Sequence, residues 1–326
     1  MGIPCSVISD PLFSRHHLDA HDENRGRLDA IEPFIPDRVH RHPSVPASFA
    51  DLLRVHDEPY VREIAALSAL DGVTFISADT YIGPGSYDVA RYAAGSSIAA
   101  AAHALQGEHC FALVRPPGHH ASRDRAMGFC IFNNAAVAAA SALEAGLDRV
   151  AILDWDLHHG NGTQSIFYDS DRVLFLSVHQ QAEFPGSGWV DEVGEGDGRG
   201  FTLNAPLAPG SSLVDVEFVL DEVFLPAMLS FDPELVIVSA GQDMLEDDPK
   251  GGLCLRPGHY GALAGRVAGA LGMPLALVLE GGYGPSQHRA VGAILDALTG
   301  IPFPPETGEP RRSTREVVTA LRRLTG

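Results

Sequence analysis

The chain has 326 residues, of which 45% are hydrophobic, and its 23 lysines and arginines against 42 aspartates and glutamates give a net charge of −19. This length suits one large α/β domain, and no apolar run approaches the roughly 20 residues that a membrane-spanning helix needs. The negative charge speaks against non-specific binding to nucleic acid or to an anionic membrane.

Strand-like and helical segments alternate along the chain. Strands are predicted at about 4–8, 110–114, 149–154, 173–178, 201–204, 235–239 and 275–280. Helices are predicted at 85–106, 132–146, 211–230 and 257–271, and an amphipathic helix at about 312–324. Because the strand-like runs are continuously apolar, they are typical of strands buried on both faces. The pattern predicts one domain, residues 1–326, with a central, mostly parallel β-sheet flanked by helices on both faces.

Polar segments and cysteines complete the outline. Long polar loops at 14–26, 36–47, 180–200 and 244–256 are expected to form the rim of a crevice. The four cysteines form no CxxC pair, which excludes a zinc ribbon or a redox dithiol. Scattered free thiols of this kind indicate a reducing, cytoplasmic location.

Four of the predicted strands end in a cluster of polar residues. FALVRPPGHH ends at His119 and His120, VAILDWDLHHG carries Asp154, Asp156 and His158, LVIVSAGQD ends at Asp243, and LALVLEGGY ends at Tyr283. In parallel sheets ligands bind outside the carboxyl ends of the strands, so the four clusters are expected to meet in one crevice. This combination of side chains predicts a metal-assisted hydrolase.

The second and third clusters predict a metal site. In an extended chain residues i, i+2 and i+4 share a face, so Asp154, Asp156 and His158 project the same way. A catalytic zinc site uses three protein ligands and leaves one position open. Asp156 and His158 supply two of them, and Asp243 can supply the third. Zinc is expected, and iron(II) could take its place because two of the three ligands are hard oxygens.

The first and fourth clusters supply groups for proton transfer. His119 and His120 follow a Pro-Gly turn, so both can face the site. A histidine with its ordinary pKa near 6.5 can take and return a proton near neutrality. Gly281 and Gly282 free the backbone before Tyr283, whose hydroxyl could donate to an oxyanion. Tandem histidines or a single tyrosine would otherwise be ordinary surface or core residues.

RPPGHHA at 115–121, GFCIFNN at 128–134, DWDLHHGNGTQ at 154–164 and LEGGY at 279–283 resemble the motifs of the zinc-dependent histone deacetylases, in the arginase–deacetylase superfamily. The match is nearer the class II and bacterial deacetylase-like or acetylpolyamine amidohydrolase branch, and it extends from about Phe13 to about Leu298. The resemblance implies an arginase–deacetylase fold and the hydrolysis of an acyl amide.

The resemblance also implies roles for single residues. His120 would be general base and then acid with Asn161 orienting it, His119 with Asp154 would be its electrostatic partner, and Tyr283 would polarise the substrate carbonyl. Phe129 and Phe184 would wall a narrow tunnel, with Gly128 and Gly282 beside the substrate and Asp79 accepting amide hydrogen bonds at the rim. A structural K⁺ or Na⁺ ion would use Asp154, Ser177 and Val178, with the carbonyls of Asp156 and His158.

Lys250 lies seven residues after Asp243, on a loop expected to overhang the crevice. The resemblance implies a glutamate at this position in polyamine-selective members of the family. The reversed charge therefore predicts that this chain disfavours acetylpolyamines and favours substrates with an anionic group near the acylated stem. Like charges within about 4 Å repel by roughly 4 kcal/mol at an effective dielectric of about 20, and exposure and salt shrink this energy. Glu246, Asp247 and Asp248 are close enough in sequence to weaken the effect, and a solvated loop lysine is the alternative.

These observations predict a zinc-dependent amidohydrolase that removes an acetyl or other acyl group from an acyl-lysine-like amine. Three alternatives stay open: an acetylpolyamine or other small-molecule deacetylase, a binuclear ureohydrolase, and an inert binding module. Gly160, two residues after His158, offers no oxygen to a second metal. The insertion that acetylpolyamine amidohydrolases use to dimerise is missing between Gly72 and Tyr87, and the oligomeric state stays undecided.

Overall fold

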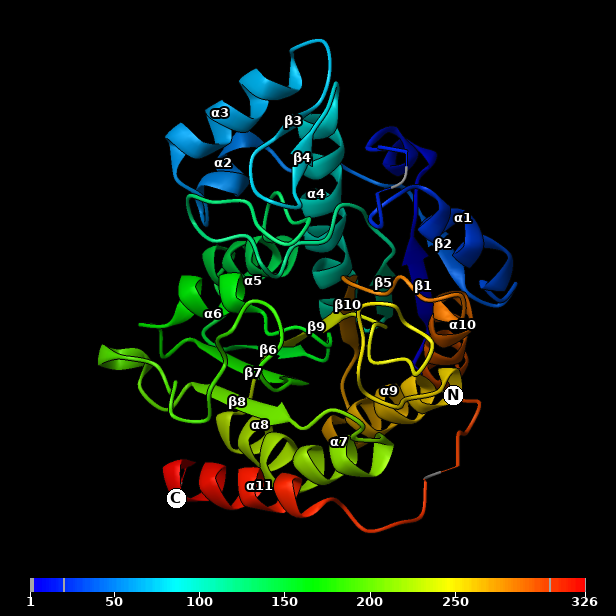
Figure 1. The fold of residues 1–326 in the computed structure, drawn as a ribbon, viewed down its shortest axis with the longest axis vertical. Helices are drawn as coiled ribbons and strands as arrows, with labels where there is room; N and C mark the ends of the chain where they lie inside the picture. Colours follow the sequence, from blue (N-terminus) through cyan, green and yellow to red (C-terminus); the bar gives the residue numbers. More distant parts are fainter. Residues whose placement is uncertain (1–2, 20, 305, 326) are drawn as a thin grey trace.

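The computed structural model describes residues 3–19, 21–304 and 306–325. At its centre is an eight-stranded sheet with the order β2–β1–β5–β10–β9–β6–β7–β8, in which all neighbouring strands are parallel (Figure 1). The strands are β1 (Cys5–Ile8), β2 (His40–His42), β5 (His109–Ala112), β6 (Val150–Asp154), β7 (Val173–Gln180), β8 (Thr202–Leu207), β9 (Leu235–Ala240) and β10 (Leu275–Leu279). The predicted α/β fold with a parallel sheet is confirmed.

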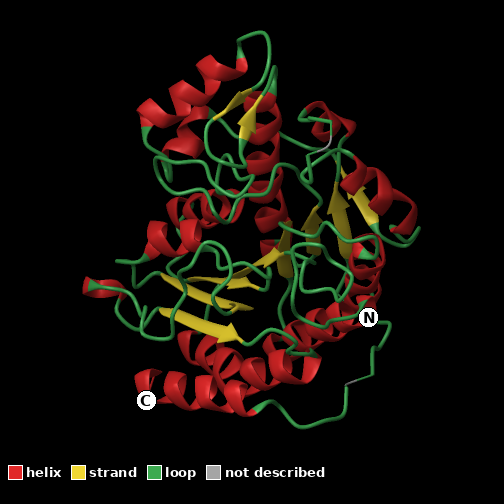
Figure 2. Cartoon of the chain, viewed as in Figure 1, coloured by secondary structure: helices red, strands yellow, loops and turns green. Residues whose placement is uncertain are grey.

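Helices cover both faces of this sheet (Figure 2). On one face, α4 (Ser86–Leu105) packs on β1, β5, β9 and β10, and α5 (Asn134–Glu144) packs on β6 and β9. On the other face lie α7 (Leu213–Val219), α8 (Leu225–Phe231), α9 (Pro257–Leu271), α10 (Gln287–Leu298) and α11 (Arg312–Thr325). Helix α11 also contacts the edge strand β8. The two layers bury every residue of each strand except those of β2.

Smaller elements complete the fold. They are α1 (Gly26–Ile31), α2 (Phe49–Leu53), α3 (Glu58–Ser68), α6 (Asn161–Phe167), the 3₁₀ turns η1 (Pro11–Arg15), η2 (Glu32–Phe34) and η3 (Gly196–Gly198), and the antiparallel pair β3 (Thr74–Phe75) and β4 (Tyr81–Ile82). Among the helices of the described residues, none combines the length and the hydropathy that a membrane crossing requires.

Two sequence expectations need correction. The loop predicted at 36–47 contains β2, a polar edge strand whose sequence HRH has no apolar run to reveal it. The helix predicted at 211–230 is divided into α7 and α8 by the π-helical turn η4 (Leu220–Phe224). Pro226 lies just beyond this turn and has no amide hydrogen for the helical bond, so the backbone adjusts locally.

The strand order determines where the polar clusters lie. Strands β5, β10, β9 and β6 are consecutive in the sheet, and each of them precedes one of the four clusters. Because the strands are parallel, all four clusters leave the sheet at the same edge.

Candidate active site

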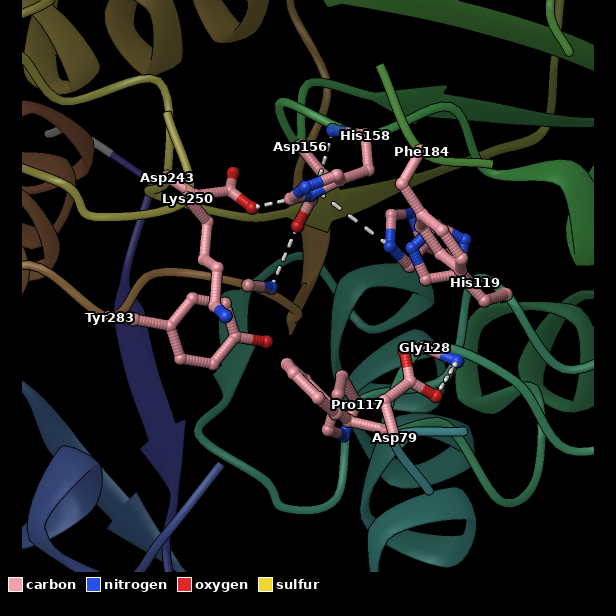
Figure 3. A pocket seen from close by; sticks show the side chains of 13 residues that line it. Asp79, Pro117, His119, Gly128, Asp156, His158, Phe184, Asp243, Lys250 and Tyr283 are labelled. Atoms are coloured by element: carbon pink, nitrogen blue, oxygen red, sulfur yellow. Dashed lines mark hydrogen bonds and ion pairs between the residues drawn. The ribbon is translucent and has the colours of Figure 1, made fainter. Parts of the chain in front are cut away.

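A cavity of about 230 Å³ opens at the carboxyl edge of these four strands (Figure 3). The predicted site residues that line it are Asp79, His119, His120, Gly128, Phe129, Asp156, His158, Phe184, Asp243, Lys250 and Tyr283. Asp154, Asn161, Ser177, Val178 and Gly282 are not part of this lining. Two of these five residues still reach the site, because Asp154 and Asn161 contact the two histidines of the lining.

Asp156, His158 and Asp243 form a compact group at the cavity. Their ligand atoms all lie within 4.8 Å of one another. The Nδ1 atom of His158 is 3.2 Å from Oδ1 of Asp156 and 3.0 Å from Oδ2 of Asp243. Both carboxylates are fully buried, while 13% of the His158 side chain is exposed. Two oxygens and one nitrogen that meet beside an accessible cavity suit a divalent metal ion with an open coordination position.

Backbone amides orient the two carboxylates of this group. The amide of Gly281 donates to Oδ2 of Asp156 over 2.7 Å, and the amide of Leu157 donates to Oδ1 of Asp243 over 2.7 Å. These bonds leave the other oxygen of each carboxylate directed at His158. A Cβ atom at Gly281 would collide with both carboxylates, so the close approach of this loop requires glycine.

The charges of the group also suit a cation. Burial and the charge of Asp156 raise the pKa of Asp243 to about 7. Burial disfavours the charged form of His158, but the hydrogen bonds that its ring donates to Asp156 and Asp243 outweigh this effect and raise its pKa to about 10. Protons on His158 and, in part, on Asp243 therefore offset the negative charge of the two carboxylates. A divalent ion would replace those protons, since metal ligands bind in their deprotonated form.

The hydrogen bonds of His119 and His120 define their tautomers. Nδ1 of His119 lies 3.0 Å from Oδ2 of Asp154, and Nδ1 of His120 lies 2.7 Å from Oδ1 of Asn161. Both oxygens are acceptors, so each Nδ1 carries a hydrogen. This arrangement leaves Nε2 of a neutral His120 as the free basic nitrogen.

The two neighbouring histidines differ in protonation. Burial disfavours a charged His119, but the carboxylates of Asp156 and Asp154 raise its pKa well above the ordinary value. Burial, followed by the positive charges of His119 and His158, lowers the pKa of His120 well below the ordinary value. Adjacent titratable groups whose pKa values are pushed apart are typical of acid–base sites. His120 is thus the neutral member of the pair.

Tyr283 is held through its ring and its backbone. Its ring meets Phe129 edge-on at 5.5 Å, and the guanidinium carbon of Arg27 lies 4.6 Å from the ring centroid. A carboxylate oxygen of Asp248 accepts the amides of Tyr283 and Gly284 over 2.6 and 2.7 Å. Burial raises the pKa of the phenol well above its ordinary value, so the hydroxyl remains a hydrogen-bond donor.

Glu280 is a supporting residue that the sequence reasoning missed. One oxygen of its buried carboxylate accepts the amides of Gly118 and His119 over 2.7 and 3.1 Å, and the other accepts the hydroxyl of Ser239 over 3.2 Å. Burial raises its pKa to about 7. The sequence feature that could have revealed Glu280 is an acidic residue directly after an apolar strand, within the LEGGY motif.

A buried charge network lies beneath Tyr283 and was also missed. Glu23 pairs with Arg27 and, at 2.6 Å, with Arg115. The Nε of Arg27 donates to the carbonyl of Gly282 over 2.8 Å, and a second guanidinium nitrogen donates to the carbonyl of Glu280. Glu23 lies in the segment 14–26, which reads as an ordinary polar loop, so its partners could not be inferred from sequence.

The mouth of the cavity has aromatic walls and a charged rim. The Phe184 ring stands perpendicular to His120 at 5.0 Å. Oδ1 of Asp79 accepts the amide of Gly128 over 3.2 Å, which leaves its second oxygen for another donor (Figure 3). Lys250 Nζ lies 6.0 Å from the centroid of Phe129 and forms an ion pair with Asp22 at 2.5 Å.

The ion pair of Lys250 differs from the sequence expectation. Its partner Asp22 belongs to the distant loop 14–26, whereas the sequence reasoning considered the neighbouring acids 246–248. The carboxylate of Asp248 instead accepts hydrogen bonds from backbone amides, including the amide of Lys250 at 2.9 Å. The two side chains are 37% and 50% exposed, so the pair lies within reach of solvent and of a bound molecule.

The residues expected to hold a monovalent ion lie on adjacent strands. Asp154 on β6 pairs in register with Ser177 on β7, and Val178 is the next residue of β7. Oδ1 of Asp154 accepts the amide of Asp156 over 3.0 Å, and the Ser177 hydroxyl lies 2.9 Å from Nδ1 of His179.

Comparisons with known proteins agree on one family. The profile described as "Histone deacetylase domain" matches residues 21–298. A "Histone deacetylase-like amidohydrolase" of Pseudomonas aeruginosa is 42% identical over 92% of this chain and 82% of its own length. A "Probable deacetylase" of Archaeoglobus fulgidus is 41% identical over 85% of this chain and 80% of its own length. The crystal structure of the "HDA15 HD domain" superposes with a TM-score of 0.93 at 34% identity, over 99% of this chain and 95% of that chain.

Proposed function

The chain belongs to the histone deacetylase family, and from this premise we propose that it is a zinc-dependent amidohydrolase that removes an acetyl or other acyl group from an acyl-lysine-like amine. The observation that carries the proposal is the meeting of a metal-binding group, a neutral histidine and a protonated tyrosine around one cavity. Membership in the family implies a metal ion, which the donor set and charge of Asp156, His158 and Asp243 suit.

We assign zinc to these three residues, with iron(II) as the alternative because two of the donors are carboxylate oxygens. Such an ion lowers the pKa of a coordinated water and polarises a bound carbonyl. A structural K⁺ or Na⁺ ion would use Asp154 and Ser177, which pair in register across β6 and β7, and Val178, the next residue of β7.

His120 is the proposed general base and acid. Its Nε2 is free, and its low pKa keeps it neutral, so it can take a proton from the attacking water and return it to the leaving amine. Asn161 holds the ring in the required tautomer. His119, paired with Asp154, provides a fixed positive charge beside the developing negative charge.

Tyr283 is the proposed oxyanion donor. Its phenol keeps its proton, and its ring is fixed by Arg27 and Phe129. A donor that is already oriented costs no reorganisation when negative charge develops on the carbonyl oxygen.

The walls of the cavity favour a slender acylated stem. Phe129 and Phe184 flank the mouth, and a side chain at Gly128 would collide with the His120 ring. Gly282 supplies a carbonyl that fixes Arg27 beneath Tyr283, so its effect on substrate binding is indirect. Asp79 has one oxygen free to accept an amide hydrogen of the substrate.

Lys250 is the proposed selectivity residue. Its ammonium disfavours a cationic acetylpolyamine and favours a carboxylate near the acylated stem, but the pair with Asp22 offsets part of its charge. A small-molecule or polyamine deacetylase therefore remains the second candidate. The ureohydrolase alternative is disfavoured because Gly160 offers no side-chain ligand, and its close approach to Asp154 leaves no room for one.

A turnover screen tests the proposal. The zinc-loaded protein should release acetate from acetyl-lysine peptides, free acetyl-lysine or acetylpolyamines, and the ranking identifies the substrate class. Failure to hydrolyse any acetyl or longer acyl amide, with zinc bound, would favour the inert binding module instead.

A further inference from the structure

A second group of potential metal ligands lies at the β2 edge of the sheet. Nε2 of His42 is 2.9 Å from Oε2 of Glu108, and Nδ1 of His103 is 3.3 Å from the same oxygen. The three ligand atoms all lie within 4.8 Å of one another. His40 adds a third imidazole, whose Nδ1 is 3.5 Å from Oε1 of Glu108.

The fold brings these residues together from three elements. His40 and His42 are two apart in β2, so their side chains share one face of the strand. His103 lies in the last turn of α4, and Glu108 lies in the connection from α4 to β5. The amide of Glu108 donates to the carbonyl of His103 over 3.1 Å, which fixes the connection.

We propose that His42, His103 and Glu108 bind a second divalent metal ion, zinc or a similar borderline ion, with His40 as a fourth ligand. Two or three imidazole nitrogens and one carboxylate oxygen are a donor set that zinc uses, and four donors would complete a tetrahedral site. The side chains of His42, His103 and Glu108 are 28%, 24% and 15% exposed, so an ion can enter while the site remains partly shielded.

Nitrogens of His42 and His103 both lie against one carboxylate oxygen of Glu108. The rings of His42 and His103 are stacked, with centroids 3.7 Å apart and an angle of 12° between them. A divalent ion would replace the hydrogens that these nitrogens direct at Glu108, and small rotations of the partly exposed rings about their Cβ–Cγ bonds would direct both nitrogens at the ion.

An ion at this position would be structural. It would tie the edge strand β2 to α4 and to the connection preceding β5. An ion that binds the folded chain and not the unfolded chain raises the free energy of unfolding, so zinc should raise the melting temperature through this site.

The test counts zinc per chain by elemental analysis after dialysis against a zinc-buffered solution. The wild type should hold two ions, and the His42→Ala/Glu108→Gln variant should hold one and keep its hydrolytic activity. His288→Ala is the matched control, because His288 is a half-buried histidine packed on Phe34 and should leave both ions in place. An equal number of ions in the wild type and in the double variant would overturn the inference.

A second measurement separates this site from the cavity. The Asp243→Ala variant should retain one zinc ion and a zinc-dependent rise in melting temperature, and both should disappear when His42→Ala/Glu108→Gln is added. If Asp243→Ala shows no zinc-dependent rise, the edge site is refuted, whatever the fate of the proposed activity. The zinc-dependent rise in melting temperature would report the edge site even if the cavity bound no zinc.

Discussion

Tyr283 is fixed by contacts that do not use its hydroxyl, namely the Arg27 guanidinium, the Phe129 ring and the Asp248 carboxylate. Tyr283→Phe should therefore keep the ring in place and remove only the oxyanion donor. We expect kcat to fall by about 10²–10³, as for the loss of one oxyanion donor, with unchanged metal content. Steady-state kinetics and metal analysis provide the test, with Tyr87→Phe in α4 as the control. An unaltered kcat would remove Tyr283 from the mechanism.

The ion pair between Lys250 and Asp22 makes a prediction about selectivity. Lys250→Glu should raise the ratio of kcat/KM for acetylspermidine to kcat/KM for acetyl-lysine with a free carboxylate. Asp22→Asn should shift it in the opposite direction, because it releases the lysine from its partner. Both shifts should shrink at high salt, since the side chains are partly exposed.

The two substitutions control for each other, because they remove opposite charges from one ion pair. If both moved the ratio in the same direction, or if neither moved it, Lys250 would be an ordinary surface lysine with no part in selectivity.

At the level of elements, the loop after β10 approaches the carboxylates of Asp156 and Asp243 so closely that only glycine fits at position 281. In Gly281→Ala the added Cβ would collide with the carboxylates of Asp156 and Asp243. We expect the variant to lose stoichiometric metal and activity. Elemental analysis and the turnover assay measure the two losses.

Gly269→Ala is the matched control for that substitution. Gly269 lies in α9 with no atom within 4 Å of an added Cβ, so alanine should stabilise the fold by about 0.5–1 kcal/mol through its higher helix propensity. A fully metallated and active Gly281→Ala protein would contradict the proposed crowding around the carboxylates.

The elements also show what the sequence could predict. The inner strands β6, β9 and β10 are continuous apolar runs, so both their existence and the edge at which they end could be predicted. The edge strand β2 has no such run. Arg27, the partner of Glu23, donates hydrogen bonds to the carbonyls of Glu280 and Gly282. These contacts span more than 250 positions of sequence, so no local pattern reveals them. Sequence therefore predicts the groups that face the cavity better than the groups that support them.

For the whole molecule, buried neutral histidines predict sensitivity to acid. Nε2 of His56 accepts the amide of Asn133, and Nδ1 of His109 accepts the amide of Leu275, so a proton on either nitrogen would displace a hydrogen bond. Burial lowers the pKa of each to about 4, from an ordinary value of 6.5. Between these values the unfolded chain binds protons that the folded chain does not. The contribution of each of these histidines to the free energy of unfolding should thus fall as the pH drops from about 6.5 to about 4, by up to about 1.4 kcal/mol per pH unit, while the buried acids Asp243 and Glu280 act in the opposite direction.

Urea unfolding of the metal-free protein at pH 7 and pH 5 measures this effect without a contribution from metal release. His56→Gln should reduce the difference between the two pH values, because its side chain cannot be protonated in the unfolded chain. The same difference between the two pH values in the wild type and in His56→Gln would show that His56 does not contribute to the response to acid.

The central claim is that a metal ion held by Asp156, His158 and Asp243 is required for amide hydrolysis in the cavity. The most direct test is acetate release from an acetylated amine by the zinc-loaded wild type, the chelator-stripped wild type and Asp243→Ala, each with its metal content measured. We predict activity in the loaded wild type alone, its return when zinc is added back to the stripped wild type, and no return in Asp243→Ala. Full activity in Asp243→Ala, or in the stripped wild type, would contradict the claim.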